Sequence, residues 1–210
     1  MKKSEHFFTD EEKKKVTEAI HKVETITAGE VVVMAVDSSD QYRDAEITGG
    51  IVFGSITAFI LTEFFFDALV WFYIPLSILF FFPFMRLVRA IPDLKAVFLG
   101  ARRKNVSVAQ RALKAFYEKG FYRTKDSTGV LFFISILEHK VWVLADKGIY
   151  TKIDQETLDK FASTVTQGIK EGRSCDALCE AISNAGQILA RYFPVRSDDT
   201  DELPDEVMTA

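Results

Sequence analysis

Two long apolar stretches dominate the pattern of polar and apolar residues along the chain. Residues 47–66 read ITGGIVFGSITAFILTEFFF, and residues 68–85 contain no charged side chain. A helix needs about 20 mainly apolar residues to cross about 30 Å of hydrocarbon, and neither stretch has the polar face of a helix on a soluble protein. The pattern therefore predicts a transmembrane helical hairpin, with helices at residues 47–66 and 68–89.

Other interpretations of this hairpin stay open. It can be a buried hairpin in a large soluble core, or a re-entrant hairpin that dips into one leaflet. Glu63 and Asp67 lie four residues apart near the turn, where a spanning hairpin would place both carboxylates at the far membrane surface. We interpret them as a solvated tip, with an intramembrane ion site as the alternative. The small residues Gly49, Gly50 and Gly54 would let the two helices approach closely.

The segments on either side alternate between helical and strand patterns. Thr9 and Glu12 form the signature of a capping box at the start of a helix. The sequence EVVVMAV at residues 30–36 predicts a buried strand. After the hairpin we expect an amphipathic helix, two antiparallel strands and two further helices, at residues 107–119, 130–136, 141–145, 153–169 and 174–193.

These elements predict one α/β domain that is interrupted by its own membrane anchor. Residues 1–46 supply one strand, and residues 90–196 supply two, so neither part alone can bury its strands. We expect the two parts to form a small mixed sheet flanked by helices, with the transmembrane hairpin of residues 47–89 inserted in a loop. Residues 197–210 carry six acids and no base, which predicts a disordered tail.

Charge predicts the orientation of the hairpin. The segment after it, residues 86–104, contains six basic residues against the single acid Asp93, whereas the turn at 64–68 contains no Lys or Arg. The positive-inside rule then places both hairpin ends, and the α/β domain, in the cytoplasm. We expect an integral protein of the inner (cytoplasmic) membrane, without a secretory signal peptide, whose basic segment contacts anionic lipid head groups.

The overall composition excludes several classes of protein. Hydrophobic residues make up 48% of the chain, the net charge is −4 and the mean hydropathy is +0.08. These values exclude a disordered chain, a collagen-like fibre and a generally basic nucleic-acid binder. No nucleic-acid partner is expected.

Three aspartates at the ends of predicted strands are the candidate metal ligands. Asp126 precedes the first antiparallel strand and Asp146 follows the second, so both are expected at the same end of the sheet. Asp37 follows the N-terminal strand and joins them if that strand runs parallel to the last one. Such carboxylates can hold Ca²⁺ or Mg²⁺, or they can simply form turns. Lys147 and Gly148 can equally form a small anion-binding nest.

A recognisable catalytic constellation is missing from the sequence. There is no P-loop, no Cys-x5-Arg motif and no acid-x-acid pair after a strand, and a phosphatase needs a nucleophile or a metal-activated water. His6, His21 and His139 are expected to be exposed to solvent. Cys175 and Cys179 lie four residues apart, but two ligands do not make a structural zinc site, so we interpret them as small helix residues.

Two segments resemble a known family. They are the sequences TGVLFFIS at residues 128–135 and EHKVWVLADKGI at residues 138–149, which follow an N-terminal helix and the strand that begins at Glu30. This pattern resembles the TPM domain family, which was once labelled as phosphatases and includes photosystem-repair proteins. The resemblance implies a mixed sheet with helices on both faces. It also implies a groove at one end of the sheet, where loop acids have been linked to divalent cations.

The resemblance also has departures that bear on function. Acid-phosphatase activity has been attributed to some members, yet typical members have a signal peptide and an extracytoplasmic domain, and here a hairpin interrupts the domain. The acid before the GVL strand is present as Asp126 but is displaced. Our first hypothesis is therefore a membrane-anchored protein-interaction or assembly module, acting through a protein partner or self-association. The second is a weak phosphatase dependent on a divalent metal.

Overall fold

The chain folds into two compact units. The computed structural model describes residues 3–65, 69–195 and 202–209. One unit contains Met1–Ser39 and Asn105–Ala210, and the other contains Asp40–Lys104. The inserted unit is longer than the predicted hairpin of residues 47–89 because its first helix begins earlier and a short helix follows its second one.

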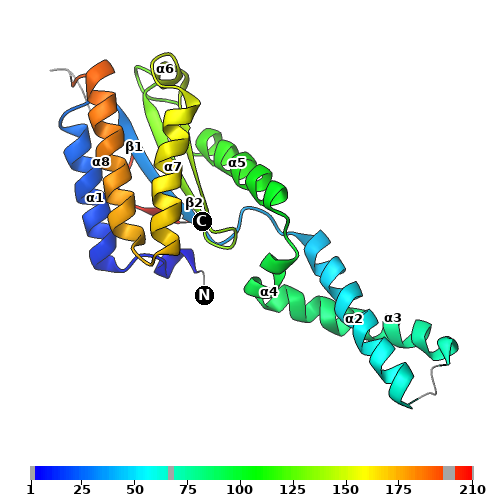
Figure 1. Ribbon diagram of the computed structural model, residues 1–210. Coiled ribbons are helices and arrows are strands. Elements are labelled where there is room, and N and C mark those ends of the chain that lie inside the picture. The colour runs from blue at the N-terminus through cyan, green and yellow to red at the C-terminus, as the bar shows by residue number, and fades with distance from the viewer. Residues whose placement is uncertain (1–2, 66–68, 196–201, 210) are drawn as a thin grey trace. The chain divides into compact units, whose positions relative to one another are not determined.

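A four-stranded mixed sheet forms the centre of the first unit (Figure 1). The strand order is β3-β2-β1-β4, with β1 parallel to both β2 and β4, and β2 antiparallel to β3. The strands are β1 (Glu30–Val36), β2 (Gly129–Ser135), β3 (Lys140–Ala145) and β4 (Met208–Thr209). The predicted α/β class and mixed sheet are confirmed.

Helices cover both faces of this sheet. One face packs against α1 (Asp10–Glu24), α7 (Gln155–Lys170) and α8 (Ser174–Tyr192), and the other packs against α5 (Ala101–Glu118). Alternate residues of β1 point to opposite faces, so Val33 joins the first core and Val32 the second. All seven residues of β1 and of β2 are buried, which explains their near-continuous apolar sequences.

Side-chain caps mark the starts of two helices, whereas α2 and α5 begin four and six residues earlier than the patterns at residues 47 and 107 indicated. Thr9 and Glu12 form the expected capping box at the beginning of α1, with the backbone N–H of Glu12 donating to Thr9 Oγ1 at 3.2 Å. Asp154 caps α7 by accepting from the backbone N–H of Thr157 at 2.9 Å. Two short helices, η1 (Ser4–His6) and α6 (Lys147–Tyr150), complete this unit.

The C-terminal segment corrects one prediction. Residues 202–209 are part of the fold: β4 extends the sheet beside β1, and Leu203 and Val207 pack against the two cores. The side chain of Glu202 also accepts the backbone N–H of Lys125 at 2.8 Å. Acidic composition suggested disorder, but the apolar residues between the acids pack against the cores and become partly buried. The rest of the predicted tail, 197–201, lies outside the described residues, as does Ala210.

The second unit is a helical hairpin. Its helices are α2 (Arg43–Phe65), α3 (Val70–Ala90) and the short α4 (Pro92–Val97), and α2 and α3 are each long and apolar enough to cross a membrane. Large apolar side chains cover their surface, including Trp71 at 85% exposure. The turn that carries Asp67 lies outside the described residues.

Small residues set the contact between α2 and α3. A Cβ on Gly50 would lie 2.9 Å from the Cβ of Met85, and one on Gly54 would lie 3.1 Å from the backbone nitrogen of Phe81. The two helices therefore approach closely along this stripe, against a side chain at Gly50 and against the backbone at Gly54, as the sequence suggested.

Candidate functional sites

The structure brings together the loops that carry Asp126 and Asp146. The start of β2 pairs with the end of β3, with Val130 opposite Ala145, and the backbone N–H of Gly148 donates to the carbonyl of Ser127 at 3.1 Å. A Cβ on Gly148 would lie 2.7 Å from the Asp126 carbonyl oxygen, so the close approach of these loops requires glycine. Both aspartates lie at one end of the sheet.

Asp146 has one occupied and one free carboxylate oxygen. Its Oδ1 accepts the backbone N–H of Lys147 at 2.7 Å and so caps α6, whereas its Oδ2 is buried and has no hydrogen-bond partner among the described residues. The N–H groups of Lys147 and Gly148 are both used within the protein. The predicted alternative of an anion nest there is therefore wrong.

Asp37 lies at the opposite end of the sheet. The strand before it, β1, is parallel to β2, and β2 is antiparallel to β3, so β1 is antiparallel to β3 and the condition for grouping the three acids is not met. Asp37 Oδ1 instead accepts the backbone N–H of Ser4 at 2.6 Å. The predicted grouping of Asp37 with Asp126 and Asp146 is wrong. The direction of β1 relative to β3 is set by the connections between the strands, and the residues within a strand do not reveal it.

A polar network near Asp37 holds the loops at its end of the sheet. Glu138 is 2% exposed, accepts the backbone N–H of Ser39 at 2.8 Å, and accepts the hydroxyl of Ser135 at 2.5 Å. The hydroxyls of Ser39 and Ser135 are 2.7 Å apart. Because each buried oxygen is matched to a donor within the chain, this network is structural.

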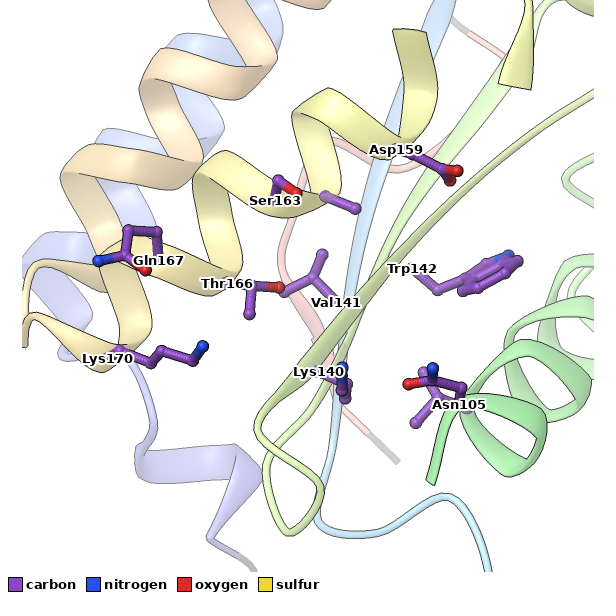
Figure 2. A pocket seen from close by; sticks show the side chains of 11 residues that line it. Asn105, Lys140, Val141, Trp142, Asp159, Ser163, Thr166, Gln167 and Lys170 are labelled. Atoms are coloured by element: carbon purple, nitrogen blue, oxygen red, sulfur yellow. The ribbon is translucent and has the colours of Figure 1, made fainter. Parts of the chain in front are cut away.

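A groove runs along β3 between α5 and α7 (Figure 2). Its volume is about 490 Å³. Figure 2 shows Trp142 and Asp159 toward one end and Lys140 and Lys170 toward the other. The sequence contained no signal for it, since its walls come from three elements that are distant along the chain. The lining residues are Asn105, Val108, Lys140, Val141, Trp142, Asp159, Ala162, Ser163, Thr166, Gln167 and Lys170.

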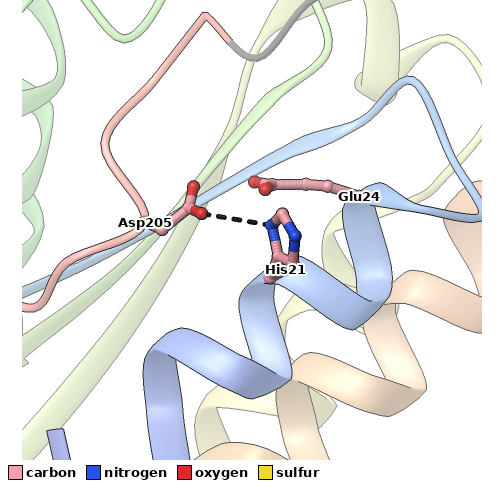
Figure 3. A group of neighbouring side chains, drawn as sticks. All are labelled: His21, Glu24 and Asp205. Carbon is pink, nitrogen blue, oxygen red and sulfur yellow. Dashed lines mark ion pairs between the residues drawn. The ribbon is translucent and has the colours of Figure 1, made fainter. Parts of the chain in front are cut away.

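A second polar cluster joins α1 to the C-terminal segment (Figure 3). His21, Glu24 and Asp205 each offer a ligand atom, and these atoms lie within 4.8 Å of one another. His21 Nδ1 is 3.5 Å from Asp205 Oδ2. Burial, and after it the negative charges of Asp205 and Glu30, raise the pKa of Glu24 to about 9. The sequence-based analysis missed this cluster because Asp205 was assigned to a disordered tail.

The two cysteines are free thiols in α8. Cys175 is buried and its thiol lies 3.7 Å from the carbonyl oxygen of Glu12. Burial, and then the neighbouring Cys179, raise the pKa of Cys175 to about 12. A reactive cysteine needs a lowered pKa and exposure, so this thiol is unsuited to nucleophilic chemistry.

Ion pairs involve part of the basic segment that follows the hairpin. Lys95 Nζ lies 2.6 Å from Glu46 Oε1, and both side chains are more than 85% buried, at 14% and 11% exposure. Arg103 pairs with Asp40 at 2.9 Å. Two of the six basic residues are thus matched to acids of the same unit.

These features define the class of protein: a small α/β domain with a mixed sheet between two helical layers, carrying an inserted apolar helical hairpin. Residues 94–188 match the family model of the TPM domain. This match confirms the resemblance to the TPM domain family seen in the sequence. The matched residues include β2 and β3, while α1 and β1 precede them along the chain.

A solved structure supports the same fold. The NMR structure of the BA42 protein from the psychrophilic bacterium Bizionia argentinensis is similar, with a TM-score of 0.61 and 22% sequence identity, over 97% of this chain and 96% of that one. At this identity the likeness concerns the fold alone. No curated protein matches the chain.

Proposed function

We propose that this protein is a membrane-anchored TPM domain that binds an extended segment of a partner protein along β3. The observation that carries the proposal is the position of β3, which is the edge strand of the sheet and has β2 as its only paired strand among the described residues. Its edge borders the groove between α5 and α7. An edge strand presents unpaired backbone N–H and C=O groups, and adding a strand from a partner satisfies them.

The dimensions of the groove suit a short extended segment. Asp159 and Lys170, both on α7, mark its two ends, and Lys170 follows Asp159 by eleven positions along the helix. At a rise of 1.5 Å per residue this is about 16 Å, the length of about five residues in a strand. Backbone pairing would supply affinity, and the side chains lining the groove would supply selectivity.

The lining residues indicate the chemistry of the partner. Lys140 and Lys170 lie toward one end of the groove and Asp159 lies toward the other. Trp142 lies beside Asp159, with an apolar ring and a polar N–H. The preferred ligand is therefore an extended segment with an acidic residue at the lysine end and an apolar residue at the tryptophan. Such a segment can come from another protein or from a second copy of this chain.

Anchoring in a bilayer is the second part of the proposal. The supporting observations are the apolar surfaces of α2 and α3 and the basic segment that follows them. We propose that the α/β domain faces the cytoplasm at the inner membrane. Because Cys175 is buried, a cysteine introduced at the exposed Asn184 is the better topology probe. Labelling by an impermeant maleimide in intact cells, at the level seen in lysed cells, would refute the cytoplasmic assignment.

Binding of a partner segment in the groove is tested by placing a large side chain in the groove. Ser163 is exposed and lines the groove, so Ser163→Arg should block a bound segment without disturbing the core. Gln110 is exposed on α5 outside the groove, and Gln110→Arg is the matched control. Each full-length protein is purified in detergent from the membranes in which it occurs, and the co-purifying proteins are quantified.

The expected result is a stoichiometric partner, or a dimer of this chain, that is retained with Gln110→Arg and lost with Ser163→Arg. Retention of every partner by Ser163→Arg would refute binding in the groove. A wild-type protein that is monomeric and has no stoichiometric partner would refute the interaction function itself.

A second candidate function is phosphomonoester hydrolysis with a divalent metal at Asp126 and Asp146. It is favoured by the contact between their two loops and by the buried, unpartnered Oδ2 of Asp146. Purified protein is assayed against a panel of phosphomonoesters with Mg²⁺, Mn²⁺ or Ca²⁺. Turnover that is unchanged in the Asp126→Ala, Asp146→Ala double variant would exclude this site.

A further inference from the structure

In the cluster of His21, Glu24 and Asp205, the two carboxyl groups face each other, and Glu24 is hydrogen-bonded to Asp205 when it carries a proton. Glu24 Oε2 and Asp205 Oδ1 are both buried and have no hydrogen-bond partner among the described residues. Figure 3 shows the two carboxylates converging, with the His21 ring beside them. Two ionised carboxylates repel each other, so either a proton or a cation must lie between them. Glu30, whose negative charge also acts on Glu24, adds to the demand for positive charge.

The geometry of this cluster matches that of a metal site. His21 and Glu24 are three residues apart on α1, and this spacing puts both side chains on one face of the helix. Pairs of Glu and His at this spacing hold metals in helical bundles. Two ligands at about 2.1 Å from a tetrahedral zinc ion are about 3.4 Å apart, and His21 Nδ1 lies 3.5 Å from Asp205 Oδ2.

We propose that His21, Glu24 and Asp205 bind a divalent metal ion that fastens the C-terminal segment to α1. One imidazole nitrogen with two carboxylates favours Zn²⁺ or Co²⁺ over Ca²⁺ and Mg²⁺. Three protein ligands leave at least one coordination position for water. Asp205 lies some 180 residues after α1 along the chain. It reaches the helix because β4 pairs with β1.

Binding of the ion would hold the C-terminal segment more firmly to the rest of the α/β unit. Within the described residues, that segment is held by pairing of Met208 and Thr209 with β1, by a hydrogen bond from Thr17 Oγ1 to the Asp205 carbonyl at 3.3 Å, and by the packing of Leu203 and Val207. A metal bridge from Asp205 to α1 adds a strong link three residues before β4. β4 then stays paired with the edge of β1 that β2 does not occupy.

The proposal is tested on the full chain in detergent after removal of metals with a chelator. Zn²⁺ binding is measured by titration calorimetry, and Co²⁺ is added as a spectroscopic probe of the ligand set. We expect one ion per chain, a higher unfolding temperature and slower digestion of the C-terminal segment by a protease. His21→Gln, Glu24→Gln and Asp205→Asn should each weaken Zn²⁺ binding by at least about tenfold.

Matched variants decide where the ion is bound. Glu18 is an exposed glutamate on the same helix, and Glu18→Gln should bind Zn²⁺ as the wild type does, as should Asp126→Asn. Circular dichroism checks that every variant is folded, which is expected because His21 is 72% exposed and the other two changes remove negative charge. Absence of saturable Zn²⁺ and Co²⁺ binding, or equal binding by Asp205→Asn and wild type, would overturn the proposal.

Discussion

The contact between α1 and α8 gives a prediction whose magnitude follows from the structure. Gly186 on α8 faces Val23 on α1, and a Cβ added at Gly186 would lie 2.4 Å from Val23 Cγ2 and 2.7 Å from Cγ1. Optimal carbon–carbon contacts are about 3.5–4.0 Å, so the helices must separate by about 1 Å. Val23 is 3% exposed and, being β-branched, cannot turn aside.

Gly186→Ala should therefore destabilise the α/β unit. Overpacking of this kind costs about 1–3 kcal/mol, against a gain of about 1 kcal/mol in helix propensity. The net loss should be up to about 2 kcal/mol, which corresponds to a fall of up to about 8 °C in the unfolding temperature of a chain of this size. Since Val23 adjoins Glu24, the same change would also move one proposed metal ligand.

A double-mutant cycle separates the clash from the propensity. Val23→Ala alone removes two buried methyl groups and should cost about 1–3 kcal/mol. With Val23→Ala already present, Gly186→Ala should become stabilising by about 1 kcal/mol, giving a coupling energy of about 1–3 kcal/mol between the two sites. Such coupling would identify the steric contact as the cause of the loss.

Urea unfolding can follow the α/β unit by itself. The chain has two tryptophans, Trp142 in β3 and Trp71 in α3, so a Trp71→Phe background leaves one fluorescent reporter. Gly100 has no atom within 4 Å of an added Cβ, and Gly100→Ala serves as the control. If Gly186→Ala is stabilising in the presence of Val23 and shows no coupling to it, the packing argument fails.

Three further predictions concern the hairpin and the thiols. Gly54→Leu should push α2 and α3 apart, because an added Cβ already lies 3.2 Å from the Phe81 Cα; spin labels on the two helices should report a longer distance. Glu46→Gln should lower the unfolding stability in detergent by about 1–3 kcal/mol, because it leaves the buried charge of Lys95 without its partner. Alkylation of Cys175 should be about a thousandfold slower at pH 8 than that of an ordinary cysteine and should still accelerate above pH 10, since its raised pKa of about 12 keeps the thiol protonated.

Each of these predictions has its own control and contrary outcome. An unchanged inter-helix distance in Gly54→Leu would contradict close packing along the glycine stripe. Adding Lys95→Met to Glu46→Gln should recover part of the lost stability, and no recovery would argue against a charge effect. The alkylation rate is measured in a Cys179→Ser background, where a plateau below pH 10 would contradict the raised pKa of Cys175.

Local patterns were enough to identify most elements of the fold. The apolar runs at β1 and β2, the capping box at Thr9 and the two apolar helices appeared at or within a few residues of the positions that the sequence indicated. The reason is that periodicity, capping and uninterrupted apolar composition act within one element or between neighbours in sequence. The antiparallel pairing of β2 and β3 followed too, because only four residues separate the two strands.

The candidate sites depended on contacts between distant parts of the chain. The direction of β1 relative to β3 follows from a crossover between β1 and β2 that contains the whole hairpin. This direction places Asp37 at the end of the sheet opposite Asp126 and Asp146. Asp205 reached α1 only through the pairing of β4 with β1. The composition of the tail showed its acids, but partial burial of Leu203 and Val207 against cores built from other segments outweighed the charge of those acids. The free energies of strand pairing and of apolar burial between distant segments arise only when those segments are in contact.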